Sequence, residues 1–175
     1  MLRLLSSFVH SRGYWFAVLA VGVGIEAVAL YYQHVLGEPP CALCIQSRAF
    51  VLLGVLFGLL GVVGARLSLL RYAAQLGLIV SLGFLWRVSR EAVLVERGLM
   101  ESTCGMDPGF PSWLPLDQWL PQVFEVWTMC GYTPDFIFGM TMGEGLLYGT
   151  VTLFFIAAAA LLVQLLTSLG FRRMA

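Results

Sequence analysis

Four long apolar stretches constrain the fold of this 175-residue chain more than any other feature. They cover residues 14–32, 45–64, 72–88 and 146–166, and each approaches the roughly 20 apolar residues that a helix needs to cross a bilayer. Only 11% of the residues are charged, about half the fraction found in a typical soluble domain. We therefore expect an all-α membrane protein, a single integral membrane domain over residues 1–175 built as a bundle of four transmembrane helices.

The distribution of charge predicts which ends of these helices face the cytoplasm. Three segments contain arginine and no acidic residue, and their arginines are Arg3, Arg12, Arg66, Arg71, Arg172 and Arg173. The other two segments, residues 33–44 and 89–145, contain most of the acidic residues. Since basic residues are retained on the cytoplasmic side, both termini should be cytoplasmic and both acidic segments should be outer loops.

The four cysteines of the chain all lie in these two outer loops, at Cys41, Cys44, Cys104 and Cys130. An even set of cysteines on the non-cytoplasmic side is typical of disulfides in an oxidising compartment. Of the possible pairings, the simplest joins Cys41 to Cys44 and Cys104 to Cys130, because each loop then closes on itself. Taken alone, the wide spacing of Cys104 and Cys130 favours a structural bond.

The C-x-x-C pair favours redox chemistry over a purely structural role. Cys41 follows two prolines that forbid a helix, and Cys44 lies where the second apolar stretch begins. Both the helix dipole and Arg48, one turn further on, would stabilise a Cys44 thiolate. A structural disulfide across two intervening residues would constrain only a short piece of chain. A zinc site would need about four ligands, and His34 is the only further candidate nearby, so we expect no metal.

A thiolate at the outer edge of the bilayer suggests a lipid-soluble electron acceptor. Arg48 could donate a hydrogen bond to a quinone carbonyl and stabilise the reduced, anionic form. Gln33 and His34 end the first apolar stretch close to the C-x-x-C pair and are candidates to line the same pocket, although a plain interfacial role is equally compatible with them. For Glu26 the sequence leaves open a paired acid, a proton relay or a protonated structural group.

The second outer loop contains a tryptophan-rich segment with helical periodicity. On a helical wheel, one face of residues 116–127 is apolar, with Leu116, Trp119, Leu120, Val123 and Trp127. This pattern predicts a short helix that either lies in the outer membrane interface or packs on top of the bundle.

Several of these motifs together resemble the disulfide bond formation protein B family. They are Cys41-Ala42-Leu43-Cys44 at the outer start of the second span, Arg48 one turn later, the Cys104 and Cys130 pair, and the run from Trp113 to Trp119 that continues with Pro121-Gln122-Val123-Phe124. The resemblance extends over nearly the whole chain. It implies a thiol oxidase of the bacterial inner membrane that reoxidises the periplasmic dithiol oxidase DsbA and reduces a quinone, either ubiquinone or menaquinone.

The resemblance also implies roles for the cysteines. Cys104 would form the mixed disulfide with DsbA, and Cys130 would be its partner in the loop disulfide. Electrons would then pass to Cys41 and Cys44, with Cys44 as the thiolate that contacts the quinone and Arg48 helping to hold that quinone. This implied redox role replaces the structural role that spacing alone favoured for Cys104 and Cys130.

Two departures from the family pattern concern the quinone pocket. Some members have a histidine near the outer end of the third span, where this chain has Arg90-Glu91-Ala92. Some have a tryptophan shortly after the last cysteine, where this chain supplies Tyr132 and Phe136 instead. Both the proton transfer and the pocket wall are therefore expected to differ here.

Two other functions compete with the oxidase. A non-enzymatic four-span scaffold would carry the same loop disulfides as staples, but a staple needs no cation beside Cys44. A transporter could place Glu26 and Arg87 on a polar pathway, but the chain has no internal repeat or broken helix of the transporter type. No feature suggests nucleic-acid binding, and the expected partners are a DsbA-like protein, membrane lipid and quinone.

Overall fold

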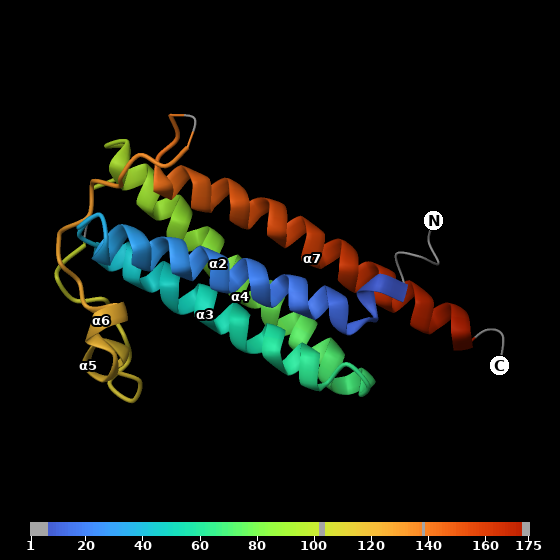
Figure 1. The fold of residues 1–175 in the computed structure, drawn as a ribbon. Coiled ribbons are helices and arrows are strands. Elements are labelled where there is room, and N and C mark those ends of the chain that lie inside the picture. The colour runs from blue at the N-terminus through green and yellow to red at the C-terminus, as the bar shows by residue number, and fades with distance from the viewer. Residues whose placement is uncertain (1–6, 102–103, 138, 173–175) are drawn as a thin grey trace.

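The computed structural model describes residues 7–101, 104–137 and 139–172. Four long helices lie side by side, namely α2 (Arg12–His34), α3 (Ala42–Val63), α4 (Ser68–Glu96) and α7 (Met142–Arg172) (Figure 1). Each contains a stretch long and apolar enough to cross a membrane, and the described residues form isolated β-bridges but no β-strand. The predicted fold class, an all-α membrane protein with four spans, is confirmed.

Local sequence explains where α3 begins and ends. Pro39 and Pro40 keep the chain out of a helix, and Cys41 follows in an extended conformation (φ −89°, ψ 170°) as the N-cap. The Cys41 sulfur accepts a hydrogen bond from the Cys44 N–H (3.3 Å), which satisfies one amide of the first turn. Gly64 caps the other end, and a short connection leads into α4.

Helix α4 extends beyond the apolar stretch that predicted it. It continues to Glu96, so that Arg90, Glu91 and Glu96 lie on a helix. At about 1.5 Å per residue, its 29 residues span roughly 43 Å, which exceeds the ~30 Å apolar core of a bilayer. The outer end of α4 is therefore a rigid support to which the second outer loop can be attached.

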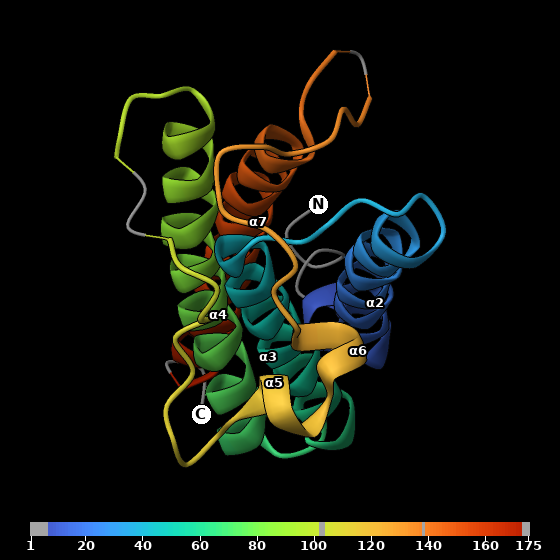
Figure 2. The same ribbon diagram turned by 90° about the vertical axis from the view of Figure 1, so that its left-hand side faces the viewer.

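Helix α3 has the central place in the bundle. It packs against α2 and α4, and α4 packs against α7, whereas α2 and α7 barely contact each other (Figures 1 and 2). Gln75 of α4 is fully buried and donates hydrogen bonds to the Tyr14 hydroxyl of α2 (3.0 Å) and to the Ala157 carbonyl of α7 (2.8 Å). One buried amide thus links the two helices that do not pack directly on each other.

The second outer loop forms two single helical turns in place of the one helix that the periodicity predicted. They are α5 (Leu116–Trp119) and α6 (Pro121–Phe124). Between them Leu120 leaves the helical region (φ −136°, ψ 66°), because Pro121 has no N–H and its ring disfavours a helical residue before it. The prediction of a single interfacial helix is therefore not confirmed.

The predicted apolar face is divided in the same way. Leu116 and Val123 pack toward the bundle, while Trp119, Leu120 and Trp127 are exposed. Phe124 is buried against the first turn of α3, and both views place α5 and α6 beside that end of the helix (Figure 2).

A glycine lets α2 and α3 approach closely around a buried tryptophan. Trp15 of α2 is fully buried, and a Cβ atom added to Gly61 of α3 would lie only 2.1 Å from its indole ring. Small residues at such contacts let transmembrane helices pack at short range.

We predict that Gly61→Ala destabilises the protein by about 1–3 kcal/mol, because the new methyl group must displace a buried indole. Gly83→Ala in α4 is the matched control, since a Cβ there meets nothing within 4 Å. The control should be neutral or slightly stabilising, because alanine is the better helix former. Reversible unfolding in detergent compares the two, and equal stability of both variants would contradict the prediction.

Candidate active site

The C-x-x-C pair occupies the N-terminus of α3, with its two sulfurs in contact. The Sγ atoms of Cys41 and Cys44 are 2.7 Å apart, close enough that a small movement would join them. Cys41 is buried (2% exposed), whereas Cys44 is half-buried and lines a cavity. The pair can therefore exist as a dithiol or a disulfide, with only its second sulfur facing the cavity.

In the reduced pair, the Cys44 N–H donates to the Cys41 sulfur (3.3 Å), and the two sulfurs lie within hydrogen-bond distance of each other. The hydrogen bond from the Cys44 thiol lowers the pKa of Cys41 to about 7, against the opposing effect of burial. Sequence reasoning expects the thiolate on Cys44, and this geometry instead favours Cys41 for the first proton loss. The hydrogen bond couples the two sulfurs, so that a charge on one is shared with the other.

Arg48 is the best-anchored polar side chain near the pair. Its guanidinium is buried and donates to the Gln33 side-chain oxygen, to the Val123 carbonyl (2.9 Å) and to the Ala29 carbonyl (3.1 Å). These acceptors belong to α2 and to the second outer loop, while Arg48 itself belongs to α3. One side chain thereby holds three segments together at the level of the cysteines.

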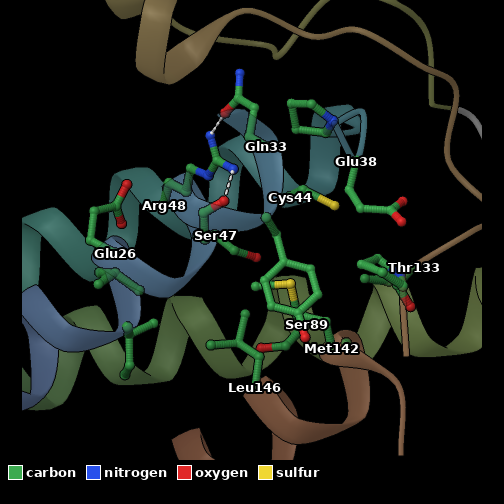
Figure 3. A pocket seen from close by; sticks show the side chains of 18 of the residues that line it. Glu26, Gln33, Glu38, Cys44, Ser47, Arg48, Ser89, Thr133, Met142 and Leu146 are labelled. Atoms are coloured by element: carbon green, nitrogen blue, oxygen red, sulfur yellow. Dashed lines mark hydrogen bonds between the residues drawn. The ribbon is translucent and has the colours of Figure 1, made fainter. Parts of the chain in front are cut away.

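A cavity of about 100 Å³ lies beside Cys44 and Arg48, between α2 and α7 (Figure 3). Helix α2 contributes one face, helix α7 contributes its first turns, and the outer loops close the top. Its lining includes Glu26, Gln33, Glu38, Cys44, Ser47, Arg48, Ser89, Thr133, Met142 and Leu146. The cavity thus lies where α2 and α7 make few contacts with each other.

A second cavity of about 260 Å³ adjoins the first, deeper between the helices. Its lining is almost entirely apolar, with side chains from all four long helices, and Ile25 and Val51 line both cavities. A ligand with a polar head beside Arg48 could therefore extend an apolar chain into the second cavity.

Hydrogen bonds to the end of α4 hold the loop wall of the first cavity. The Glu96 carboxylate accepts from the hydroxyls of Thr133 (2.5 Å) and Thr141 (3.2 Å). Arg97 forms an ion pair with Glu144 (2.5 Å) beside them. At the mouth, the Glu38 carboxylate raises the pKa of Tyr132. The unforeseen extension of α4 therefore positions part of the cavity.

The loop cysteines lie next to the C-x-x-C pair. Cys104 and Cys130 form a disulfide, and all four cysteines belong to one apolar cluster with Leu43 and Val88. The main chain brings them together, because the Pro40 carbonyl accepts hydrogen bonds from the amides of Trp127 (2.9 Å) and Thr128 (3.3 Å). The segment that leads to Cys130 thus runs alongside Cys41.

The structure separates the two residues proposed at the end of the first span. Gln33 is fully buried, lines the cavity and orients Arg48. His34 does not line it; its Nε2 lies 2.9 Å from the Gln122 carbonyl, and its ring packs edge-on against Trp127. Sequence reasoning missed Ser47, Ser89, Thr133 and Met142, which come from distant segments with no shared spacing signal. Within residues 7–101, 104–137 and 139–172, no group of three or more His, Cys, Asp or Glu side chains could hold a metal ion.

Comparisons with known proteins found one matching family and several similar relatives. The family model described as Disulfide bond formation protein DsbB matches residues 11–166. A Disulfide bond formation protein B of Shewanella loihica is 40% identical over 141 residues, covering 80% of this chain and 82% of the relative. Disulfide bond formation protein B 2 of Pseudomonas aeruginosa is 40% identical over 138 residues, covering 77% and 80%.

The lowered pKa of Cys41 makes a prediction for the reduced pair. In a Cys104→Ser, Cys130→Ser variant, the ultraviolet absorbance of thiolate should rise with a midpoint near pH 7, because a lowered pKa populates the thiolate at lower pH than in an ordinary cysteine. Adding Cys44→Ala removes the hydrogen bond, and the midpoint should then move up. A midpoint that Cys44→Ala leaves in place would contradict this cause.

Proposed function

The chain belongs to the disulfide bond formation protein B family, and from this premise we propose a membrane thiol oxidase that passes electrons from a periplasmic partner to a quinone. The family implies disulfide bond formation at a membrane. We propose a soluble dithiol oxidase of the DsbA type as the electron donor and ubiquinone or menaquinone as the acceptor.

The proposed location is the bacterial inner membrane, with both termini in the cytoplasm and both cysteine loops in the periplasm. Two observations support this orientation. Arg12, Arg66 and Arg71, which belong to acid-free segments, lie at the opposite end of the bundle from the cysteines, as the positive-inside rule requires. All four cysteines lie together at the other end, where an oxidising compartment would allow them to form disulfides.

The observation that carries the proposal is that Cys44 and Arg48 line one cavity, which lies between α2 and α7. A quinone is dissolved in the bilayer, so it can enter sideways between α2 and α7. Arg48 is placed to hold the quinone head, with Gln33 orienting it, and the Gln33 Nε2 is buried without a partner among the described residues. The adjoining apolar cavity suits an isoprenoid tail.

Three steps carry electrons from the partner to the quinone. A thiolate of the reduced partner attacks Cys104, Cys130 leaves as the thiolate, and the partner's second thiol resolves the mixed disulfide. The Cys104–Cys130 dithiol then reduces the Cys41–Cys44 disulfide by the same chemistry and becomes a disulfide again. Finally, the Cys41–Cys44 dithiol gives up two electrons and two protons to the quinone, which accepts them as the hydroquinone.

We predict that Cys44→Ser abolishes quinone-dependent oxidation of the reduced partner. Loss of thiols is followed in a mixture of purified protein, reduced partner and a short-chain ubiquinone analogue. Cys104→Ser is the informative control, because it should block the protein partner while a small dithiol such as dithiothreitol still drives quinone reduction. Full activity of Cys44→Ser, or wild-type protein that oxidises no thiols, would refute the proposed function.

Arg48→Lys should raise the KM for quinone about tenfold, which corresponds to about 1.4 kcal/mol. Lysine keeps the charge, but its ammonium group cannot reproduce the planar set of bonds that fixes the Arg48 guanidinium. Arg97→Lys is the control, since the Arg97 ion pair is exposed and such pairs contribute little. The two KM values are measured with the same dithiol at saturation; equal values in both variants would argue against Arg48 as the quinone-holding residue.

A further inference from the structure

Glu26 is a buried acid whose hydrogen-bonding capacity is unused. Its side chain is 7% exposed, and neither carboxyl oxygen has a hydrogen-bond partner in the part of the chain that the structure describes. It lines the same cavity as Cys44 and Arg48. Buried polar groups in proteins are normally satisfied, so two orphaned oxygens on a cavity wall point to a polar ligand.

The surroundings of Glu26 favour a neutral carboxyl that can act as a donor. An ionised carboxylate with no donor on either oxygen is costly in an apolar environment. Arg48 is the nearby cation, but its hydrogen bonds go to Gln33, Val123 and Ala29 rather than to Glu26. Arg48 does act electrostatically on Glu26, so it could stabilise the carboxylate once a proton has left.

Glu26 and Cys44 lie at opposite ends of the cavity. Cys44 is in the first turn of α3, whereas Glu26 lies eight positions before the outer end of α2, about 12 Å deeper along that helix. Figure 3 shows the same order, with Glu26 at one end, Arg48 and Ser47 between, and Cys44 and Glu38 at the other. The two carbonyl oxygens of a para-quinone point in opposite directions, so a ring lying along the cavity would direct one of them inward.

We propose that Glu26 contacts the quinone as a catalytic acid, donating a hydrogen bond to the inward carbonyl oxygen and then its proton as the ring is reduced. This inference rests on the proposed function. When the Cys41–Cys44 disulfide forms, two electrons leave the sulfurs and two thiol protons are released. Glu26 protonates the inward oxygen, one thiol proton goes to the outward oxygen, and the other restores the Glu26 acid, so that dithiol and quinone become disulfide and hydroquinone.

No other lining residue is as well placed for this step. In the part of the lining that the structure describes there is no histidine or lysine, and the second carboxylate, Glu38, lies at the outer mouth beside Tyr132. Glu125 of the second outer loop is exposed and does not line the cavity, so it is a matched control for the loss of a carboxyl group outside the binding site.

The first test measures binding without turnover, in a Cys44→Ser background. Quinone binding is followed by quenching of tryptophan fluorescence, and the protonated carboxyl of Glu26 by its C=O band in infrared difference spectra. Adding quinone should shift that band, and Glu26→Gln should remove it. Because an amide can still donate a hydrogen bond, Glu26→Gln should bind quinone within about twofold of its parent, whereas Glu26→Leu should bind about tenfold more weakly.

The second test measures catalysis with the other cysteines intact. Glu26→Gln should lower kcat at saturating quinone by about 100-fold or more, the range expected for loss of a general acid. Reduction of the protein's own disulfides by the partner, measured in one turnover without quinone, should be unchanged. Glu125→Gln should keep kcat within about twofold. Thermal unfolding in detergent confirms that each variant is folded. If Glu26→Leu does not fold, Glu26→Gln alone provides the test, because its side chain is nearly the same size as that of glutamate.

The outcomes separate this inference from the proposed function. Wild-type protein that reduces quinone, together with Glu26→Gln at full kcat or an infrared band that quinone does not shift, would overturn the role of Glu26 and leave the oxidase proposal standing. Wild-type protein that neither binds nor reduces quinone would overturn both.

Discussion

The arrangement of the outer end depends on the hydrogen bonds of the buried Arg48. A guanidinium taken out of water must find acceptors, and this one finds them on α2 and on the second outer loop while its own backbone belongs to α3. The same bonds fix Gln33 and hold the Val123 segment close to the bundle. The position of Cys44, one turn before Arg48, is therefore set relative to all three segments.

The remaining contacts at this end bring the redox groups together and leave one side open. Hydrogen bonds to the Pro40 carbonyl place the segment leading to Cys130 alongside Cys41, so the loop disulfide and the C-x-x-C pair share one apolar cluster. Helices α2 and α7 contribute to both cavities but barely contact each other. The proposed oxidase, which would connect a water-soluble dithiol with a lipid-soluble acceptor, needs a short path between disulfides and a lateral entrance.

Sequence patterns predicted the bundle well and its outer loops only in part. Hydropathy detects the apolar centre of a span, so it found four helices but stopped short of the outer end of α4, where Glu91 and Glu96 continue the helix in a polar environment. Helical periodicity suggested one helix over residues 116–127, but Pro121 divides it into two turns. Gln33 and His34 are adjacent in sequence, yet consecutive positions on a helix point about 100° apart, and only Gln33 reaches the cavity.

The sequence by itself determined the class of protein, the four spans, the location of all four cysteines at one end of those spans and the conjunction of Cys44 with Arg48. These properties follow from local hydropathy, charge and one turn of helix. Tertiary structure alone decided which residues meet at the cavity, that Glu26 faces it without a hydrogen-bond partner among the described residues, and that Arg48 binds Gln33, Val123 and Ala29. The physical reason is that helix rotation and loop placement depend on how segments far apart in the chain satisfy each other's buried polar groups and fill each other's surfaces, and local sequence does not encode that.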